Sequence, residues 1–237
     1  MIYQYEELGH QRYLAQIDFG GMPFEKVWRI SKLLEQRFYQ KLKSIQRGSN
    51  MKVVAISGAV IGKKTLTAMK YVAEKMNKDF PEVEFDLIDL GEKDIQFSDG
   101  RNYTEYQGDT LEVTTKIMEA DALIIGTPIF QASIPGSVKN IFDLLPEKAL
   151  RDKVVSIVVT AGSAKHYLVA EMQLKPILSY MKAQVLPEIV FIEGQDLFRQ
   201  EIINADINFR LDKLVEDTLT MVETFKELRK KQEDALF

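Results

Sequence analysis

The sequence contains no cysteine, which excludes disulfides, iron–sulfur clusters and dithiol redox chemistry. Histidine is also scarce: His10 and His166 are the two histidines among 237 residues, and they do not make a His-rich metal site. We therefore expect no bound metal. Any redox chemistry must come from a bound cofactor.

Long apolar runs and a dominant charge sign are missing as well. No apolar run reaches the roughly 18 residues of a transmembrane helix, and the chain does not start like a signal peptide, so we expect a cytoplasmic protein. Its 31 Lys and Arg are interspersed with 35 Asp and Glu, for a net charge of -4. Because no broad positive field results, we expect neither nucleic acid nor a membrane as partner. Any affinity for phosphate must be local.

Strands and helices alternate after Met51, as judged from apolar runs and helical spacing. Strands are expected at 52–57, 83–88, 121–126, 153–160 and 184–192, and helices at 65–78, 110–119, 137–144, 165–182 and 206–231. Such alternation predicts parallel βαβ units with right-handed crossovers. Continuous apolar strands such as VVAI indicate a sheet covered by helices on both faces. The expected fold is an α/β three-layer sandwich with a five-stranded parallel sheet.

Residues 1–50 have a different pattern and form an N-terminal extension, with 51–237 as the main domain. Phe24, Trp28 and Phe38 lie near helical spacing in an amphipathic helix expected at roughly 23–45. Its apolar stripe must be buried on the core, on another subunit or on a partner protein.

Ligands of parallel α/β sheets bind beyond the carboxyl ends of the strands, near the point where the strand order reverses. Three loops that follow strands are therefore candidates for a binding site. They are residues 57–65, 127–136 and 160–166.

The first loop resembles a P-loop but lacks its spacing. Only three residues separate Gly58 from Gly62, and Lys64 separates Lys63 from Thr65, so ATP and GTP are excluded as P-loop ligands. No GxGxxG is present either. The remaining features are hydroxyls and lysines at a helix start, which suit a terminal monophosphate, and Thr65 could cap the helix at the same time. Alternatively, the threonines only cap the helix and the lysines are solvated.

The other two loops suit a planar ring. TPIFQASIPG at 127–136 contains two prolines, which make a rigid platform where Phe130 could pack beside a heterocycle. The alternative is a stiff connection with Phe130 in the core. TAGSAKH at 160–166 has small residues that let a ligand approach the backbone, and His166 is either a catalyst or a capping or surface residue.

The stretch 127–186, from TPIFQASIPG through TAGSAKH to MKAQVL, resembles the NAD(P)H-dependent FMN reductase family, which has the flavodoxin-like fold. The resemblance is greatest to the FMN reductases that supply reduced flavin to two-component alkanesulfonate monooxygenases, and it covers about 51–231. It implies hydride transfer from NADPH or NADH to flavin N5, which requires no acid–base side chain. It also implies a homodimer or homotetramer and a possible flavin-dependent monooxygenase as partner, with 1–50 as an arm that braces subunits, covers the flavin or docks the monooxygenase.

The resemblance assigns the candidate site residues by position. The phosphate of FMN would lie on Ser57, Ala59, Lys63, Lys64, Thr65 and Thr67. The isoalloxazine would lie beside Pro128, Ile129, Phe130 and Ser133, with Thr160, Ala161, Gly162 and Ser163 near its pyrimidine edge.

Two departures from the family pattern keep alternatives open. The phosphate loop of the family usually reads GSxRxxSxxT, whereas here Ala59 replaces a serine, Ile61 lies near the position of the arginine, and Lys63 replaces a second serine. In addition, Ile134-Pro135 stands where sulfonate-system reductases can carry an inserted tyrosine, and it is similar to the SIPG of quinone, azo-dye and chromate reductases. The alternatives are such an FMN-bound reductase or a non-enzymatic flavodoxin-like electron carrier, although such carriers are usually more acidic than this chain.

Overall fold

The computed structural model describes residues 51–234, and everything below concerns this part of the chain. By its contacts the chain divides into two units, 1–49 and 50–237. The predicted helix at 23–45 lies outside the described residues.

Five parallel strands form the central sheet in the order β2-β1-β3-β4-β5. Their bounds are β1 Lys52–Ser57, β2 Glu84–Asp89, β3 Ala122–Pro128, β4 Val154–Ala161 and β5 Gln184–Glu193. The order reverses between β1 and β3, which is the flavodoxin-like arrangement. Ser57 pairs with Gly126 and Pro128 with Thr160, so β1, β3 and β4 end at one edge of the sheet. The predicted fold class is confirmed.

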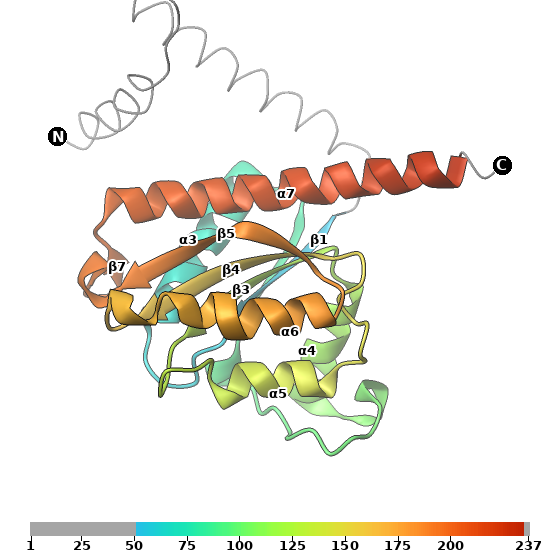
Figure 1. The fold of residues 1–237 in the computed structure, drawn as a ribbon, viewed down its shortest axis with the longest axis horizontal. Helices are drawn as coiled ribbons and strands as arrows, with labels where there is room; N and C mark the ends of the chain where they lie inside the picture. The colour runs from blue at the N-terminus through green and yellow to red at the C-terminus, as the bar shows by residue number, and fades with distance from the viewer. Residues whose placement is uncertain (1–50, 235–237) are drawn as a thin grey trace, which may run out of the picture. The chain divides into compact units, whose positions relative to one another are not determined.

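Helices cover both faces of this sheet (Figure 1). One face carries α3 (Lys64–Asp79) and α7 (Ala205–Asp234), and the other carries α4 (Gly108–Glu119), α5 (Gly136–Leu144) and α6 (Lys175–Tyr180). Successive strand residues point to opposite faces. Val155 and Ile157 therefore join the core under α4, α5 and α6, whereas Ser156 between them meets Thr218 of α7, with 2.5 Å between the hydroxyl oxygens.

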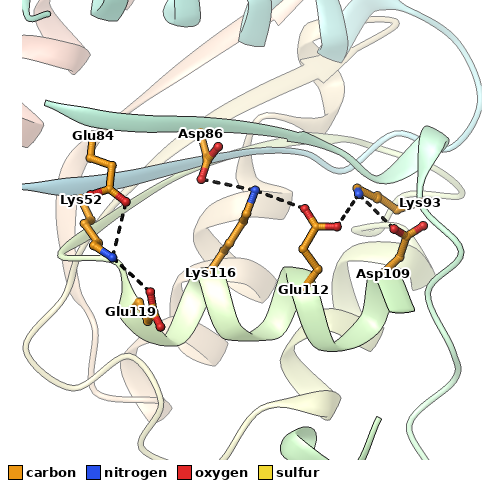
Figure 2. A network of polar contacts seen from close by, with 8 residues as sticks. All are labelled: Lys52, Glu84, Asp86, Lys93, Asp109, Glu112, Lys116 and Glu119. Atoms are coloured by element: carbon orange, nitrogen blue, oxygen red, sulfur yellow. Dashed lines mark hydrogen bonds and ion pairs between the residues drawn. The ribbon is translucent and has the colours of Figure 1, made fainter. Parts of the chain in front are cut away.

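A row of ion pairs ties α4 to β1, β2 and the segment after β2 (Figure 2). Three lysines each lie between two carboxylates, at nitrogen–oxygen distances of 2.7–3.4 Å: Lys93 between Asp109 and Glu112, Lys116 between Glu112 and Asp86, and Lys52 between Glu84 and Glu119. The hydrogen bond from Lys93, with that from Lys116, lowers the pKa of the Glu112 carboxyl. These pairs are solvent-accessible, so each contributes little to stability.

The structure differs from the sequence prediction mainly after β4. The helix expected at 165–182 is broken into a 3₁₀ turn at Ala164–His166, a π-helical segment at Ala170–Leu174, and α6. Pro176 accounts for part of this, because it has no N–H to donate and its ring would crowd the carbonyl of Met172 in a regular helix. A short hairpin, β6 Leu197–Phe198 and β7 Glu201–Ile202, was also not predicted.

Candidate functional site

The three loops predicted separately from the sequence meet at the carboxyl edge of β1, β3 and β4. The Ser137 hydroxyl at the start of α5 donates to the Gly58 carbonyl at 2.8 Å, which joins the first loop to the second. The Ile129 N–H donates to the Thr160 carbonyl at 3.0 Å and joins the second loop to the third. The Thr65 and Thr160 hydroxyl oxygens lie 2.7 Å apart and join the third to the first. The loops therefore form one site at the topological switch point.

The N-terminus of α3 has no side-chain cap. Lys63 occupies the N-cap position without a capping hydrogen bond, and the first turn holds no acidic residue. The prediction that Thr65 caps this helix is wrong, because its buried hydroxyl is paired with Thr160. The Thr67 hydroxyl instead donates to the Lys63 carbonyl at 2.9 Å. Within the described residues, no hydrogen bond uses a backbone N–H of residues 59–66 as donor. Uncapped N–H groups at the positive end of a helix dipole suit an anion.

Ser57 is the first residue of the first loop. It ends β1, is fully buried, and its Oγ has no hydrogen-bond partner in the described part of the chain. By strand alternation its side chain points to the α3 face of the sheet. Buried hydroxyls nearly always have a partner, because leaving one unpaired costs about 1–3 kcal/mol. A polar ligand atom that reached this hydroxyl by displacing the residues that cover it would provide the missing partner.

Two glycines shape the first loop. A Cβ on Gly58 would overlap the Val138 side chain and come within 2.9 Å of the Gly126 carbonyl oxygen. Gly62 has φ +84°, a left-handed conformation that favours glycine. Both positions let the backbone approach the sheet edge and turn into α3.

The second loop presents a tight turn after β3. The backbone groups of Phe130 and Ser133 exchange two hydrogen bonds of 3.0 Å, and Gln131 and Ala132 between them have φ 48° and 58°. Phe130 is 40% exposed, so the alternative that placed it in the core is wrong. Pro128 is buried and Ile129 is partly buried, as a rigid platform requires.

The third loop is hydrogen-bonded to the last residue of β5. Ala161 is buried, Gly162 exposed and Ser163 half-buried, and the Ala164 N–H donates to Glu193 Oε2 at 3.1 Å. His166 lies half-buried in the 3₁₀ turn and makes no hydrogen bond within the described range.

Sequence reasoning missed several residues of this edge. Gln173 accepts a hydrogen bond from the Ser133 hydroxyl at 2.7 Å, and Ser137 and Glu193 bond loop backbone. Gly194 follows β5, and a Cβ there would lie 2.9 Å from Lys64 Nζ, which places that ammonium group over the end of β5. Ser137 directly follows the loop predicted at 127–136, and this position is a signal that it contributes to the loop contacts. Gln173 lies inside a predicted helix and gives no local signal.

Comparison with known proteins identifies the family. Residues 51–197 match the family described as NADPH-dependent FMN reductase. The chain belongs to this family. It is 39% identical over 173 residues to an NAD(P)H-dependent FAD/FMN reductase of Geobacillus thermodenitrificans, covering 72% of this chain and 93% of the relative. It is 30% identical over 162 residues to the NADH-dependent FMN reductase SfnF of Pseudomonas fluorescens, covering 68% of this chain and 86% of the relative.

Solved structures agree on the fold of this FMN reductase family member. An apo NADH:FMN oxidoreductase (EMOB) aligns with a TM-score of 0.61 at 24% identity and covers 73% of this chain and 90% of its own. A flavodoxin from the domain Archaea aligns with a TM-score of 0.52 at 11% identity, covering 73% and 99%.

Family membership confirms the predicted enzyme class, an NAD(P)H-dependent FMN reductase that uses FMN and a reduced nicotinamide. Among residues 51–234, no group of three or more His, Cys, Asp and Glu could hold a metal ion. None of the helices in the same range is both long and apolar enough to cross a membrane.

Proposed function

We propose that this reductase binds FMN at the joined loops, with the phosphate at the start of α3 and the ring beside the Phe130–Ser133 turn. The observation that carries the proposal is the pairing of an uncapped α3 N-terminus with the buried, unpaired Ser57 hydroxyl. When bound, FMN supplies the hydride-accepting N5 atom, so the protein needs only to bind and orient two rings.

At the phosphate end, the Ser57 hydroxyl and the free N–H groups of the loop at Ala59 and beyond donate hydrogen bonds. Lys63 and Lys64 supply positive charge, in place of the arginine found in the family's loop. Thr65 and Thr67 complete this end, and the Thr65–Thr160 hydroxyl pair holds it at a fixed distance from the ring end. Donors that are already oriented favour a phosphate ester over a neutral alcohol.

At the ring end, the exposed side chain of Phe130 would give an apolar support beside the backbone of Pro128 and Ile129. The polar edge of the ring would lie near Thr160, Ala161, Gly162 and Ser163. Exposed Gly162 leaves that edge accessible. His166 could act as an additional contact, but hydride transfer requires no side-chain acid or base.

We further propose that reduced FMN leaves the protein for a flavin-dependent monooxygenase in the cytoplasm. The reductase would act as a homodimer or homotetramer braced by residues 1–50. The Pseudomonas relatives named NADH-dependent FMN reductases support a free flavin as the substrate. The alternative is a reductase that keeps its FMN and reduces a quinone, azo dye or chromate. One observation favours this alternative: α5 starts directly after Pro135 and is a regular α-helix, with no inserted turn that carries a tyrosine.

Steady-state oxidation of NADPH and NADH, measured with and without added FMN, tests these proposals. A flavin supplier is expected to purify with little bound flavin and to show saturable dependence on FMN. A protein that purifies yellow and turns over only with a quinone or azo dye would be the second kind of enzyme. Absence of turnover under both conditions would instead indicate an electron carrier and reject the proposal.

A further inference from the structure

Gln173 connects the segment after β4 to the turn that carries Phe130. Its Oε1 accepts a hydrogen bond from the Ser133 hydroxyl at 2.7 Å, and its Nε2 donates to the Ala132 carbonyl at 3.4 Å. One side chain therefore contacts two consecutive residues of the turn from 40 residues away. Because the Ser133 hydroxyl donates its hydrogen to Gln173, this side chain links the turn to the segment after β4.

The turn needs such support. Gln131 and Ala132 both have positive φ, which is unfavourable for residues with a Cβ, and neither is the glycine or asparagine usual at these positions. Backbone conformations of this kind persist only where the surroundings determine them, and they are often found at functional sites. The hydrogen bond that Gln173 accepts from Ser133 and the one that it donates to Ala132 add to the two backbone bonds between Phe130 and Ser133 in fixing this geometry.

The π-helical segment at Ala170–Leu174 determines where Gln173 points. Ala170 and Leu174 are fully buried in the core, which fixes the segment from the inside, whereas Met172 is 73% exposed. A π-helical turn contains more residues than an α-helical turn, so it changes which side chain faces a given neighbour. Here Gln173 faces the turn, and such segments are frequent at functional sites.

We propose that Gln173 is a positioning residue, which holds the Phe130–Ser133 turn in the conformation that supports the flavin ring. It acts through Ser133 and Ala132 and touches none of the reacting atoms. This inference rests on the proposed function, because it gives the turn its purpose. It adds that flavin binding depends on a residue outside the three loops.

Substitution of Gln173 by alanine and by glutamate tests the inference in the full-length enzyme. Substitution of the neighbouring Met172 by alanine is the control. Gln173→Ala is expected to raise the FMN Kd and KM about tenfold, the equivalent of about 1.4 kcal/mol. Gln173→Glu keeps an oxygen that accepts from Ser133 and should recover part of this loss. Met172→Ala changes the adjacent exposed side chain and should leave both constants within twofold of the wild type.

A double-mutant cycle separates positioning from general destabilisation. Ser133→Ala and Gln173→Ala should each weaken FMN binding, and the double variant should be no weaker than the worse single variant, because both remove one shared contact. Fully additive losses, or a Gln173→Ala variant with wild-type FMN Kd, would overturn the inference. If Gln173→Ala and Met172→Ala unfold at equal thermal midpoints, the weaker FMN binding of Gln173→Ala comes from the turn and not from a loss of overall stability. FMN Kd from flavin fluorescence does not depend on turnover, so an inactive wild type would reject the proposed function while the Kd values of the variants would still decide this inference.

Discussion

Replacing Ser57 with alanine should stabilise the ligand-free protein and weaken its binding of FMN. The Ser57 hydroxyl is fully buried, with no partner among the described residues. Removing an unpaired buried hydroxyl removes its desolvation penalty, for which we expect a gain of about 1–2 kcal/mol in the free energy of unfolding. In a domain of this size, each kcal/mol raises Tm by about 2–4 °C.

The same substitution should cost affinity if the hydroxyl serves the flavin phosphate. A hydrogen bond to a charged group contributes about 1.5–3 kcal/mol, so the FMN Kd should rise roughly 10- to 100-fold. Urea unfolding of the ligand-free protein, followed by circular dichroism, measures the first effect. Titration of FMN by flavin fluorescence measures the second.

Ser156 provides a matched control on the same face of the same sheet. It is also fully buried, but its hydroxyl oxygen lies 2.5 Å from that of Thr218. Ser156→Ala should therefore destabilise the protein by about 1 kcal/mol and leave FMN binding unchanged. The reasoning would be refuted if Ser57→Ala lost as much stability as Ser156→Ala, or if it bound FMN as tightly as the wild type.

Three further changes probe the site and its scaffold. Gly58→Ala should lower the free energy of unfolding by about 1–3 kcal/mol and weaken FMN binding, because the new Cβ overlaps Val138; urea unfolding should show part of the stability restored by adding Val138→Ala. Burial raises the pKa of the Glu223 carboxyl from 4.5 to about 7, so the contribution of this group to stability is fully present below about pH 4.5 and is lost as the pH rises through 7. Glu223→Gln should remove this loss, which is worth up to about 3 kcal/mol at about 1.4 kcal/mol per pKa unit. In urea unfolding, the variant should have a higher midpoint than the wild type at pH 8 but not at pH 4. Lys116→Met should change stability by no more than about 1 kcal/mol, with any change disappearing in thermal scans at 1 M salt, because its ion pairs are solvent-accessible.

The sheet and the meeting of the three candidate loops could be predicted from the sequence because both follow from local patterns. Apolar runs set all five strands to within two residues, and strands alternating with helices required parallel pairing. Parallel pairing in turn requires that the loops after the strands share one edge. The hairpin at 197–202 was missed because each of its strands is two residues long and leaves no periodicity to detect.

The contacts that assemble the site could not be predicted in the same way. Thr65 has the residue type and the place of a helix cap, yet its hydroxyl binds Thr160, 95 residues further along the chain. The broken helix after β4 has a helical pattern throughout, and only its packing reveals the π-helical segment that turns Gln173 toward Ser133. A distant partner overrides the local preference in the first case, and core packing overrides it in the second.

Strand order explains why these partners are distant. Because β3 lies between β1 and β4, the loops after these strands are neighbours in space, and they bring together residues as far apart in the sequence as Thr65 and Thr160, which are separated by 95 residues. A hydroxyl near this edge of the sheet can therefore be paired by a residue of another strand, as Thr65 of α3 is by Thr160 of β4, or be left without a partner in the described chain, as Ser57 is. Spacing in the sequence cannot distinguish these two outcomes, since both residues lie in the same loop. Thr65 therefore joins two loops, whereas the Ser57 hydroxyl has no partner in the described chain, which is why Ser57 is the sharper target for mutation.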